Sequence, residues 1–333
     1  MNYKKVDLCY LPTDIEYINK FSSISNNNIY IKRDDRTGLA LGGNKARKLE
    51  YFMQEALNKK ADYIVTYGSP HSNHCRLTAA AASKLGLPCL LILSQPNEEP
   101  KYNGNFFLFN LFNAKIIYTD YDKVSKTIDQ ELDKLFKQGY NPFFIYGGGH
   151  GNLGTHSYVE AYLEIKNQAE EINVNLDYIF FASGTGTTQA GLIIGNIING
   201  GDERIIGISI ARKEKKGIKV IRDSIYDYCE ENKIFISESD INIEFIDDYI
   251  GDCYGDSSRE VLDTIKEVAN LEGILLDPIY TGKAFYGMKQ YLISKNISNK
   301  TILFIHTGGI PILFSNTDKF REDISERNKY IND

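Results

Sequence analysis

Lys45 has the residue type and the local sequence that a covalent lysine site needs. It follows Gly42-Gly43-Asn44, where two glycines allow a tight turn and the asparagine can cap a helix. Apolar side chains then recur at helical spacing, which places Lys45 in the first turn of a helix. The positive end of a helix disfavours a charged lysine, and a neutral lysine amine forms a Schiff base with an aldehyde. From this segment alone, a solvated surface lysine explains the pattern better.

A second candidate is the run Gly184-Thr185-Gly186-Thr187-Thr188, which follows a short apolar strand. Small residues and hydroxyls between a strand and a helix form a cradle of N–H and O–H donors for an anion. No Gly-Lys-Ser/Thr follows, so the run is not a P-loop, and Gln189 replaces the third glycine of a dinucleotide fingerprint. Arg212 and Lys213 end the next strand and suit a 2′-phosphate, so an NADP-dependent oxidoreductase is the alternative from another class. A Gly/Thr-rich turn without a ligand is the structural alternative.

Ser72-Asn73-His74 also stands between a predicted strand and a predicted helix. Ser72, Asn73 and the backbone N–H groups that follow can hold a carboxylate at the start of that helix. A simple helix cap by either residue explains the run at least as well.

Two later loops carry polar groups at strand ends. His306-Thr307-Gly308-Gly309 offers the Thr307 hydroxyl and backbone N–H groups to the same edge, and a helix-terminating turn explains it nearly as well. In the loop 277–283, Tyr280 suits a general acid, a ring-stacking group or a core residue.

Short apolar strands alternate with helices along the chain, which predicts parallel sheets covered on both faces. In such sheets ligands bind at the carboxyl ends of the strands, where these loops lie. The predicted strands are 29–33, 63–67, 90–93, 116–118, 143–146, 178–181, 205–210, 243–245, 274–276 and 302–305. Helices are predicted from Lys45 onward and over 74–84, 105–111, 123–136, 152–167, 188–198, 218–231, 259–271 and 281–294.

Composition narrows the class of protein. The 333 residues suffice for two domains, and a net charge of −6 without a long basic run argues against nucleic-acid or membrane partners. No apolar stretch approaches the ~20 residues that span a bilayer, and the N-terminus lacks a signal-peptide pattern. The five scattered cysteines contain no Cys-x-x-Cys pair and complete no zinc pattern with the histidines. We therefore expect a cytoplasmic protein without a metal site.

Taken together, the loops resemble the D-cysteine desulfhydrase / 1-aminocyclopropane-1-carboxylate deaminase family of pyridoxal-phosphate enzymes. The resemblance covers residues 7–315. The runs that carry it are Ile31-Lys32-Arg33-Asp34-Asp35, Gly42 to Lys48, Ser72-Asn73-His74, Gly184 to Thr188, Asp277 to Lys283 and His306 to Gly309.

The resemblance implies a fold for the chain and roles for individual residues. The family has the tryptophan-synthase-β-like fold (fold type II), an α/β fold of two three-layer α/β/α domains with mostly parallel sheets. Lys45 would then bind pyridoxal phosphate covalently and Thr307 would meet its pyridine nitrogen. The catalytic candidates are Lys45, Ser72, Tyr254 and Tyr280. The cofactor-binding candidates are Lys45, Asn73 for the ring hydroxyl, Gly184, Thr185, Gly186, Thr187 and Thr188 for the phosphate, and Thr307. The substrate-binding candidates are Ser72, Asn73, His74 and His150.

The implied reaction is α,β-elimination from a small amino acid, which yields a keto acid and ammonia. A neutral partner such as Thr307 leaves the ring nitrogen less protonated than an acid would, which suits expulsion of a β leaving group. His74 and Thr281 stand where the cyclopropane deaminases usually carry Gln and Glu, so D-cysteine is the leading substrate. The alternatives in the family are 1-aminocyclopropane-1-carboxylate and other β-substituted alanines. His150 and Thr187 depart from the family pattern, and His150 is either a cleft residue or an exposed loop residue.

We expect a large cofactor-binding domain from residues 1–45 and 152–333, and a small inserted domain from residues 46–151. Gly147-Gly148-Gly149 is the predicted crossing between them. A homodimer is the expected assembly.

Overall fold

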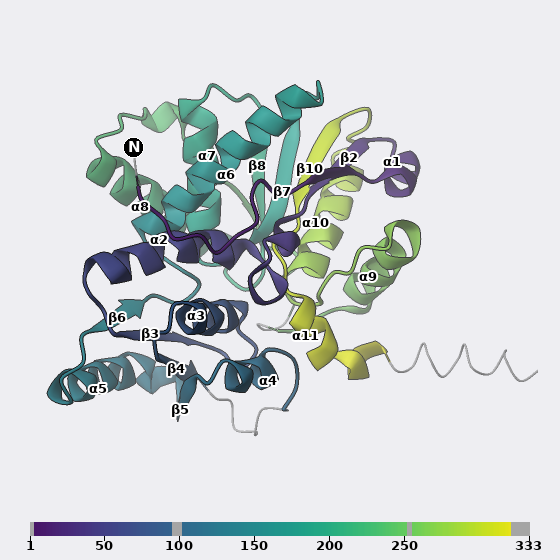
Figure 1. The fold of residues 1–333 in the computed structure, drawn as a ribbon. Coiled ribbons are helices and arrows are strands. Elements are labelled where there is room, and N and C mark those ends of the chain that lie inside the picture. Colours follow the sequence, from purple (N-terminus) through teal and green to yellow (C-terminus); the bar gives the residue numbers. More distant parts are fainter. Residues whose placement is uncertain (1–2, 95–101, 252–254, 321–333) are drawn as a thin grey trace, which may run out of the picture.

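The computed structural model describes residues 3–94, 102–251 and 255–320, and it shows the predicted alternation of helices and strands (Figure 1). The helices are α1 (Asn19–Ser25), α2 (Asn44–Asn58), α3 (Asn73–Lys84), α4 (Gly104–Leu111), α5 (Val124–Lys137), α6 (Asn152–Glu171), α7 (Thr187–Ile198), α8 (Glu214–Asn232), α9 (Arg259–Glu272), α10 (Thr281–Ser294) and α11 (Ile310–Ser315). The strands are β1 (Ile15–Tyr17), β2 (Asn28–Lys32), β3 (Tyr63–Gly68), β4 (Cys89–Ser94), β5 (Lys115–Thr119), β6 (Pro142–Ile145), β7 (Tyr178–Ser183), β8 (Arg204–Ser209), β9 (Glu244–Ile246) and β10 (Thr301–Ile305).

The larger sheet has six strands in the order β1-β2-β10-β7-β8-β9, and only β1 pairs antiparallel. Its central strand β7 is buried throughout, as expected for a parallel strand covered on both faces. Tyr178 and Phe180 pack with α9 and α10 on one face, whereas Ile179 and Phe181 pack with α6, α7 and α8 on the other. The sheet is therefore the middle of three layers.

The smaller sheet has four parallel strands in the order β5-β4-β3-β6. Ile64 and Leu91 face the helices α2 and α3, and Val65 and Ile92 face α5. All four strands lie within residues 46–151, and all six strands of the larger sheet lie outside that range. The sheet memberships agree with the predicted division into two domains, whose boundaries stay a prediction.

Helix α2 lies between the two layered bodies and packs against both α6 and α3 (Figure 1). Its apolar residues Ala46, Leu49 and Met53 are fully buried in the core beside the smaller sheet. The first turn of α2 is thereby held at the junction of the two sheets.

The predicted strand 274–276 is wrong. The segment pairs with no described strand, although the Leu275 carbonyl lies 2.9 Å from Nε2 of His306, the residue after β10. Ile274 and Leu276 are buried in the core beneath α9 and α10. Burial, rather than sheet formation, accounts for the apolar residues.

Two local features differ from the prediction. Helix α1 was not predicted, because its Ser-rich sequence has low helix propensity, and it forms where Phe21 packs into the core. Asn44 is the first helical residue of α2 rather than its cap, which is Gly43, and its side chain points to another helix. Among the described residues, no helix has both the length and the apolar character needed to cross a membrane.

Candidate active site

The turn before α2 brings Lys45 into the junction. Gly42 has φ +62°, and a Cβ there would lie 2.0 Å from the Asp35 carbonyl oxygen, so only glycine fits. Lys45 is in the first turn of α2, as predicted, and is partly exposed. Its amine makes no hydrogen bond or ion pair with any described residue.

The Lys45 amine has the electrostatics of a nucleophile. Burial lowers its pKa to about 8, because low-dielectric surroundings disfavour the charged form. The neutral fraction of the amine at neutral pH is therefore far larger than that of an ordinary lysine. A neutral amine is the form that adds to an aldehyde.

Lys48 was missed as a site residue, although it lies one turn after Lys45 on the same face of α2. It is fully buried, and its Nζ donates to Thr187 Oγ1 at 2.6 Å. Burial lowers the pKa of Lys48 well below its ordinary value, and the Lys45 charge lowers it further. The three-residue spacing was the signal that could have found it.

The Gly184–Gly186 turn leads from β7 into α7, which begins at Thr187. The first backbone N–H groups of a helix lack intrahelical acceptors and favour an anion. Thr188 Oγ1 accepts from Asn44 Nδ2 at 3.4 Å, so the start of α7 faces the start of α2. The Gly/Thr run, which is the predicted cradle, therefore lies beside Lys48 and the start of α2.

The start of α3 supplies Ser72 and Asn73. Ser72 caps α3, because its hydroxyl oxygen accepts from Cys75 N at 3.2 Å. Its O–H proton remains available to a ligand. The Asn73 Oδ1 atom accepts from Arg76 Nη1 at 3.1 Å and from Asn105 Nδ2 at 2.8 Å. Asn73 Nδ2 donates to no described residue.

His74 lies in the first turn of α3, and its side chain is buried on the side of the smaller sheet rather than exposed. Thr66 Oγ1 gives its single proton to the Ile145 carbonyl, so His74 Nε2, 2.9 Å from Thr66 Oγ1, must be the donor to it. Its Nδ1 is then an acceptor without a partner in the described chain. Burial and the charges of Lys45 and Lys48 lower the pKa of His74 to about 3, so the ring is neutral.

The β10–α11 loop places Thr307 against the start of α2. The Thr307 carbonyl accepts from Asn44 N at 3.0 Å, and a Cβ on Gly308 would lie 2.7 Å from Gly43 Cα. Thr307 is nearly buried, and its hydroxyl makes no hydrogen bond to the described residues. Thr307 is thus joined through Asn44 to both Lys45 and the cradle.

Two of the three remaining predicted residues, His150 and Tyr280, lie within the described chain. His150 is half-buried and contacts the cradle through a hydrogen bond to the Thr185 backbone, and burial lowers its pKa. Tyr280 packs against the core of the larger sheet, and its backbone N–H donates to the buried Asp277 carboxylate. Tyr254 lies outside the described residues.

These residues fit pyridoxal phosphate. Lys45 and Lys48 have no carboxylate partner among the described residues, so an anionic ligand would stabilise the charged form of each amine, which burial disfavours. The cradle offers donors to a phosphate, the Asn73 amide offers N–H to an oxyanion, and Lys45 offers an amine to an aldehyde. Each functional group of the cofactor thus has a complementary group in the chain.

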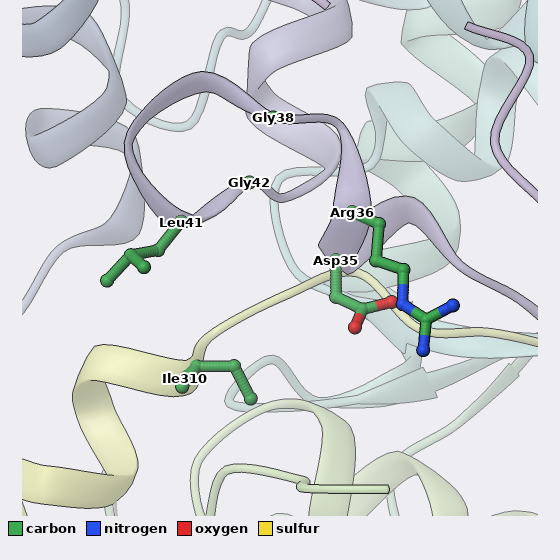
Figure 2. A pocket seen from close by; sticks show the side chains of 6 residues that line it. All are labelled: Asp35, Arg36, Gly38, Leu41, Gly42 and Ile310. Carbon is green, nitrogen blue, oxygen red and sulfur yellow. The ribbon is translucent and has the colours of Figure 1, made fainter. Parts of the chain in front are cut away.

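A cavity of about 310 Å³ lies between the turn before α2 and the start of α11 (Figure 2). Its lining is Asp35, Arg36, Gly38, Leu41, Gly42 and Ile310. None of the predicted site residues lines it, so it is separate from the lysine-containing centre.

The layered fold and the lysine beside an anion cradle define a pyridoxal-phosphate enzyme of fold type II. The family model "Pyridoxal-phosphate dependent enzyme" matches residues 6–308, and the chain belongs to this family.

The individual proteins to which the chain is similar agree with this family assignment. The chain is 38% identical over 325 residues to a D-cysteine desulfhydrase of Salmonella paratyphi A, covering 94% of this chain and 96% of the relative. A crystal structure described as an ACC deaminase homologue matches with TM-score 0.89 and 37% identity, covering 96% of each chain. Threonine deaminase isoform 2 of Solanum lycopersicum shares the fold, with TM-score 0.65 and 16% identity, covering 91% of this chain and 85% of the deaminase. The predicted family, fold, cofactor and class of enzyme, a pyridoxal-phosphate-dependent lyase, are confirmed.

Replacing Lys48 by methionine tests its contact with the cradle. We expect the dissociation constant for pyridoxal phosphate to rise about 10- to 100-fold, because a charge-assisted hydrogen bond contributes roughly 1.5–3 kcal/mol. Covalent attachment at Lys45 should persist. Titration of the apoenzyme with cofactor, followed by absorbance, measures this. Lys59→Met, at the exposed end of α2, is the matched control, and equal affinities in both variants would contradict the assignment.

Proposed function

We propose that this chain is a D-cysteine desulfhydrase, which converts D-cysteine and water into pyruvate, sulfide and ammonia. The observation that carries the proposal is the unpaired Lys45 amine beside an anion cradle, in a chain 38% identical to a D-cysteine desulfhydrase. When bound, pyridoxal phosphate withdraws electrons from the substrate α-carbon, so that the α-proton and the β-substituent can leave.

The roles of the residues follow from the groups that they leave unpaired. Lys45 would bind the cofactor aldehyde, and the cradle with Lys48 would hold the phosphate. Asn73 Nδ2 would donate to the ring hydroxyl oxygen, and the Thr307 hydroxyl would meet the ring nitrogen. These assignments place the cofactor between α2, α3, α7 and the β10–α11 loop.

The substrate carboxylate would lie at the start of α3. The Ser72 hydroxyl proton and the first backbone N–H groups of that helix are suitable donors. Ser72 is also the candidate for moving the α-proton. His74 and His150 would contact the substrate, and Tyr254 and Tyr280 would lie over it.

A second candidate is 1-aminocyclopropane-1-carboxylate deamination, because the similar crystal structure is described as an ACC deaminase homologue. Thr281, at a position where such deaminases usually carry Glu, argues against it. Its hydroxyl donates to Asp277 Oδ1 at 2.8 Å and the residue is fully buried, so it supplies no carboxylate to a ligand. The family match also disfavours the NADP-dependent alternative.

A panel of D- and L-amino acids, scored for keto acid, sulfide and ammonia, tests the proposal. We expect D-cysteine to give the highest kcat/KM, with pyruvate and sulfide in equal amounts. Faster release of 2-oxobutanoate from 1-aminocyclopropane-1-carboxylate would favour the second candidate. A yellow protein that releases no keto acid from any substrate would contradict both.

Thr307→Ala tests the partner of the ring nitrogen. We expect the cofactor to remain bound and kcat to change about 2- to 13-fold, because one neutral hydrogen bond contributes roughly 0.5–1.5 kcal/mol. Steady-state kinetics and the absorbance spectrum measure both quantities, with the exposed Thr317→Ala as control. Complete loss of cofactor would identify Thr307 as a phosphate-binding or structural residue instead.

We also propose that the enzyme is a cytoplasmic homodimer. The thiols of Cys9, Cys75, Cys89 and Cys229 are free and buried, as is usual in a reducing compartment. Light scattering after gel filtration should give about twice the chain mass of 37.8 kDa, and a monomeric mass would contradict the assembly.

A further inference from the structure

The amide of Asn73 has a defined orientation. Its Oδ1 atom lies 3.1 Å from Arg76 Nη1, and a guanidinium can only donate hydrogen bonds. The oxygen must therefore face Arg76, and the NH₂ group must point elsewhere. This orientation is what allows Asn73 to donate to a ligand.

A second asparagine enforces the same orientation from another helix. Asn105, in the first turn of α4, is fully buried. Its Nδ2 donates to the His71 carbonyl at 2.7 Å and to Asn73 Oδ1 at 2.8 Å, and its Oδ1 accepts from Arg76 Nη1 at 2.9 Å. The His71 carbonyl can only accept and Arg76 can only donate, so the Asn105 amide cannot turn over without losing both partners.

We propose that Asn105 is a positioning residue that makes Asn73 present its NH₂ group, rather than its oxygen, to the cofactor ring oxygen. The inference rests on the proposed function, because the ligand at Asn73 is taken to be the cofactor. Asn105 itself touches no reacting atom.

Arg76 connects this pair to the turn before α2. Its Nη2 donates to the Gly42 carbonyl at 2.7 Å, while its Nη1 is shared by the two asparagines. Burial lowers the pKa of Arg76 to about 9, so it is still protonated at neutral pH. Each of these three hydrogen bonds goes to a neutral oxygen, so a carboxylate introduced beside Arg76 would be stabilised.

We therefore expect Asn105→Asp to reverse the direction of the hydrogen bond between residues 105 and 73. An ionised aspartate cannot donate, so it would keep Arg76 and lose the bond to Asn73 Oδ1. Arg76 Nη1, which both asparagines now share, would donate to the new carboxylate alone, because an ionised acceptor binds it more strongly. Once Arg76 no longer holds its oxygen, Asn73 would turn over to donate its NH₂ group to the carboxylate, and its oxygen would then face the ring oxygen of the cofactor. An acceptor facing an oxyanion is repulsive, so the oxyanion would bind its proton more tightly.

The experiment is a pH titration of the visible absorbance of the holoenzyme, which reports protonation of the lysine-bound chromophore. We expect the midpoint to rise by about one unit in Asn105→Asp relative to wild type, because a donor to the oxyanion is replaced by an acceptor. The control is Asn110→Asp, the same change at an exposed position of α4, which should leave the midpoint unchanged. A merely structural role would lower the melting temperature without moving the midpoint.

Equal midpoints in wild type and folded Asn105→Asp would overturn the inference. If Asn105→Asp does not fold, Asn105→Ala replaces it: the midpoint should then rise by less, since Arg76 still holds Asn73, and an unchanged midpoint would again overturn the inference. A wild-type protein without a visible chromophore would instead contradict the proposed function, so the two failures are distinguishable.

Discussion

Lys45→Ala should remove covalently bound cofactor and lower kcat by about 10³-fold or more, because the nucleophile that attaches the aldehyde is lost. The structure offers no substitute: Lys48 is one turn away, fully buried and hydrogen-bonded to Thr187. Reduction with borohydride, followed by mass spectrometry of the peptides, measures attachment directly. Only wild type should carry the mass of the cofactor, on the peptide that contains Lys45.

Lys126→Ala is the matched control, because Lys126 also stands in the first turn of a helix but is exposed. Its activity and spectrum should equal those of wild type. Cofactor still attached by a reducible bond in Lys45→Ala would disprove the assignment of the attachment site. Attachment at Lys48 in that variant would show that the two amines are interchangeable.

Arg47→Met is expected to have the largest effect on stability, about 3–5 kcal/mol, because it leaves the buried Asp34 carboxylate without its ion-pair partner, whereas Glu164 keeps Lys32. Arg47 Nη2 lies 2.7 Å from Asp34 Oδ1 and 2.8 Å from Glu164 Oε1, and Asp34 is fully enclosed. Urea denaturation measures the free energy of unfolding. Arg36→Met is the control, since its partners are solvent-exposed and such pairs contribute at most about 1 kcal/mol.

The same ion pairs predict how the difference in the free energy of unfolding between wild type and Arg47→Met depends on pH. Burial raises the pKa of Asp34, but the charges of Arg47 and Lys32 and the hydrogen bonds from Arg47 and Tyr158 together outweigh burial and hold the pKa below its usual value. A lowered folded-state pKa stabilises the protein above the unfolded pKa, and that contribution is lost as the pH falls through the folded pKa. The difference in the free energy of unfolding between wild type and Arg47→Met should therefore be largest at pH 7 and should decrease below about pH 4. A gap independent of pH would mean that packing, and not charge, explains it.

The fold was largely predictable because strand and helix periodicities differ. Tyr178–Phe181 is a continuous apolar run bounded by turn residues, and it forms the buried centre of the larger sheet. The segment 274–276 is also a short apolar run, but it pairs with no described strand, and Ile274 and Leu276 are buried in the core instead. Sequence periodicity describes burial and contains no information on which segments pair.

The site was predictable where one loop carries the chemistry. Lys45 and the Gly/Thr turn each stand at the start of a helix, and the family resemblance joined them. Lys48, Arg76 and Asn105 were missed because their roles come from contacts between distant segments: Lys48 meets Thr187 across 139 positions, and Asn105 meets Asn73 across 32. Such contacts are a property of the folded chain, and only the three-residue spacing of Lys45 and Lys48 left a signal in the sequence.

Because Lys45 and Lys48 belong to one turn of α2, the separation between them is set by the helix itself. Three residues advance the helix by about 4.5 Å, whatever the positions of the neighbouring sheets. In the proposed site, the helix would thus fix the distance between the amine that binds the aldehyde end of the ligand and the amine that binds its phosphate end. Inserting a single residue between the two lysines would rotate one of them by about 100° relative to the other, and the two ends could no longer be held at once.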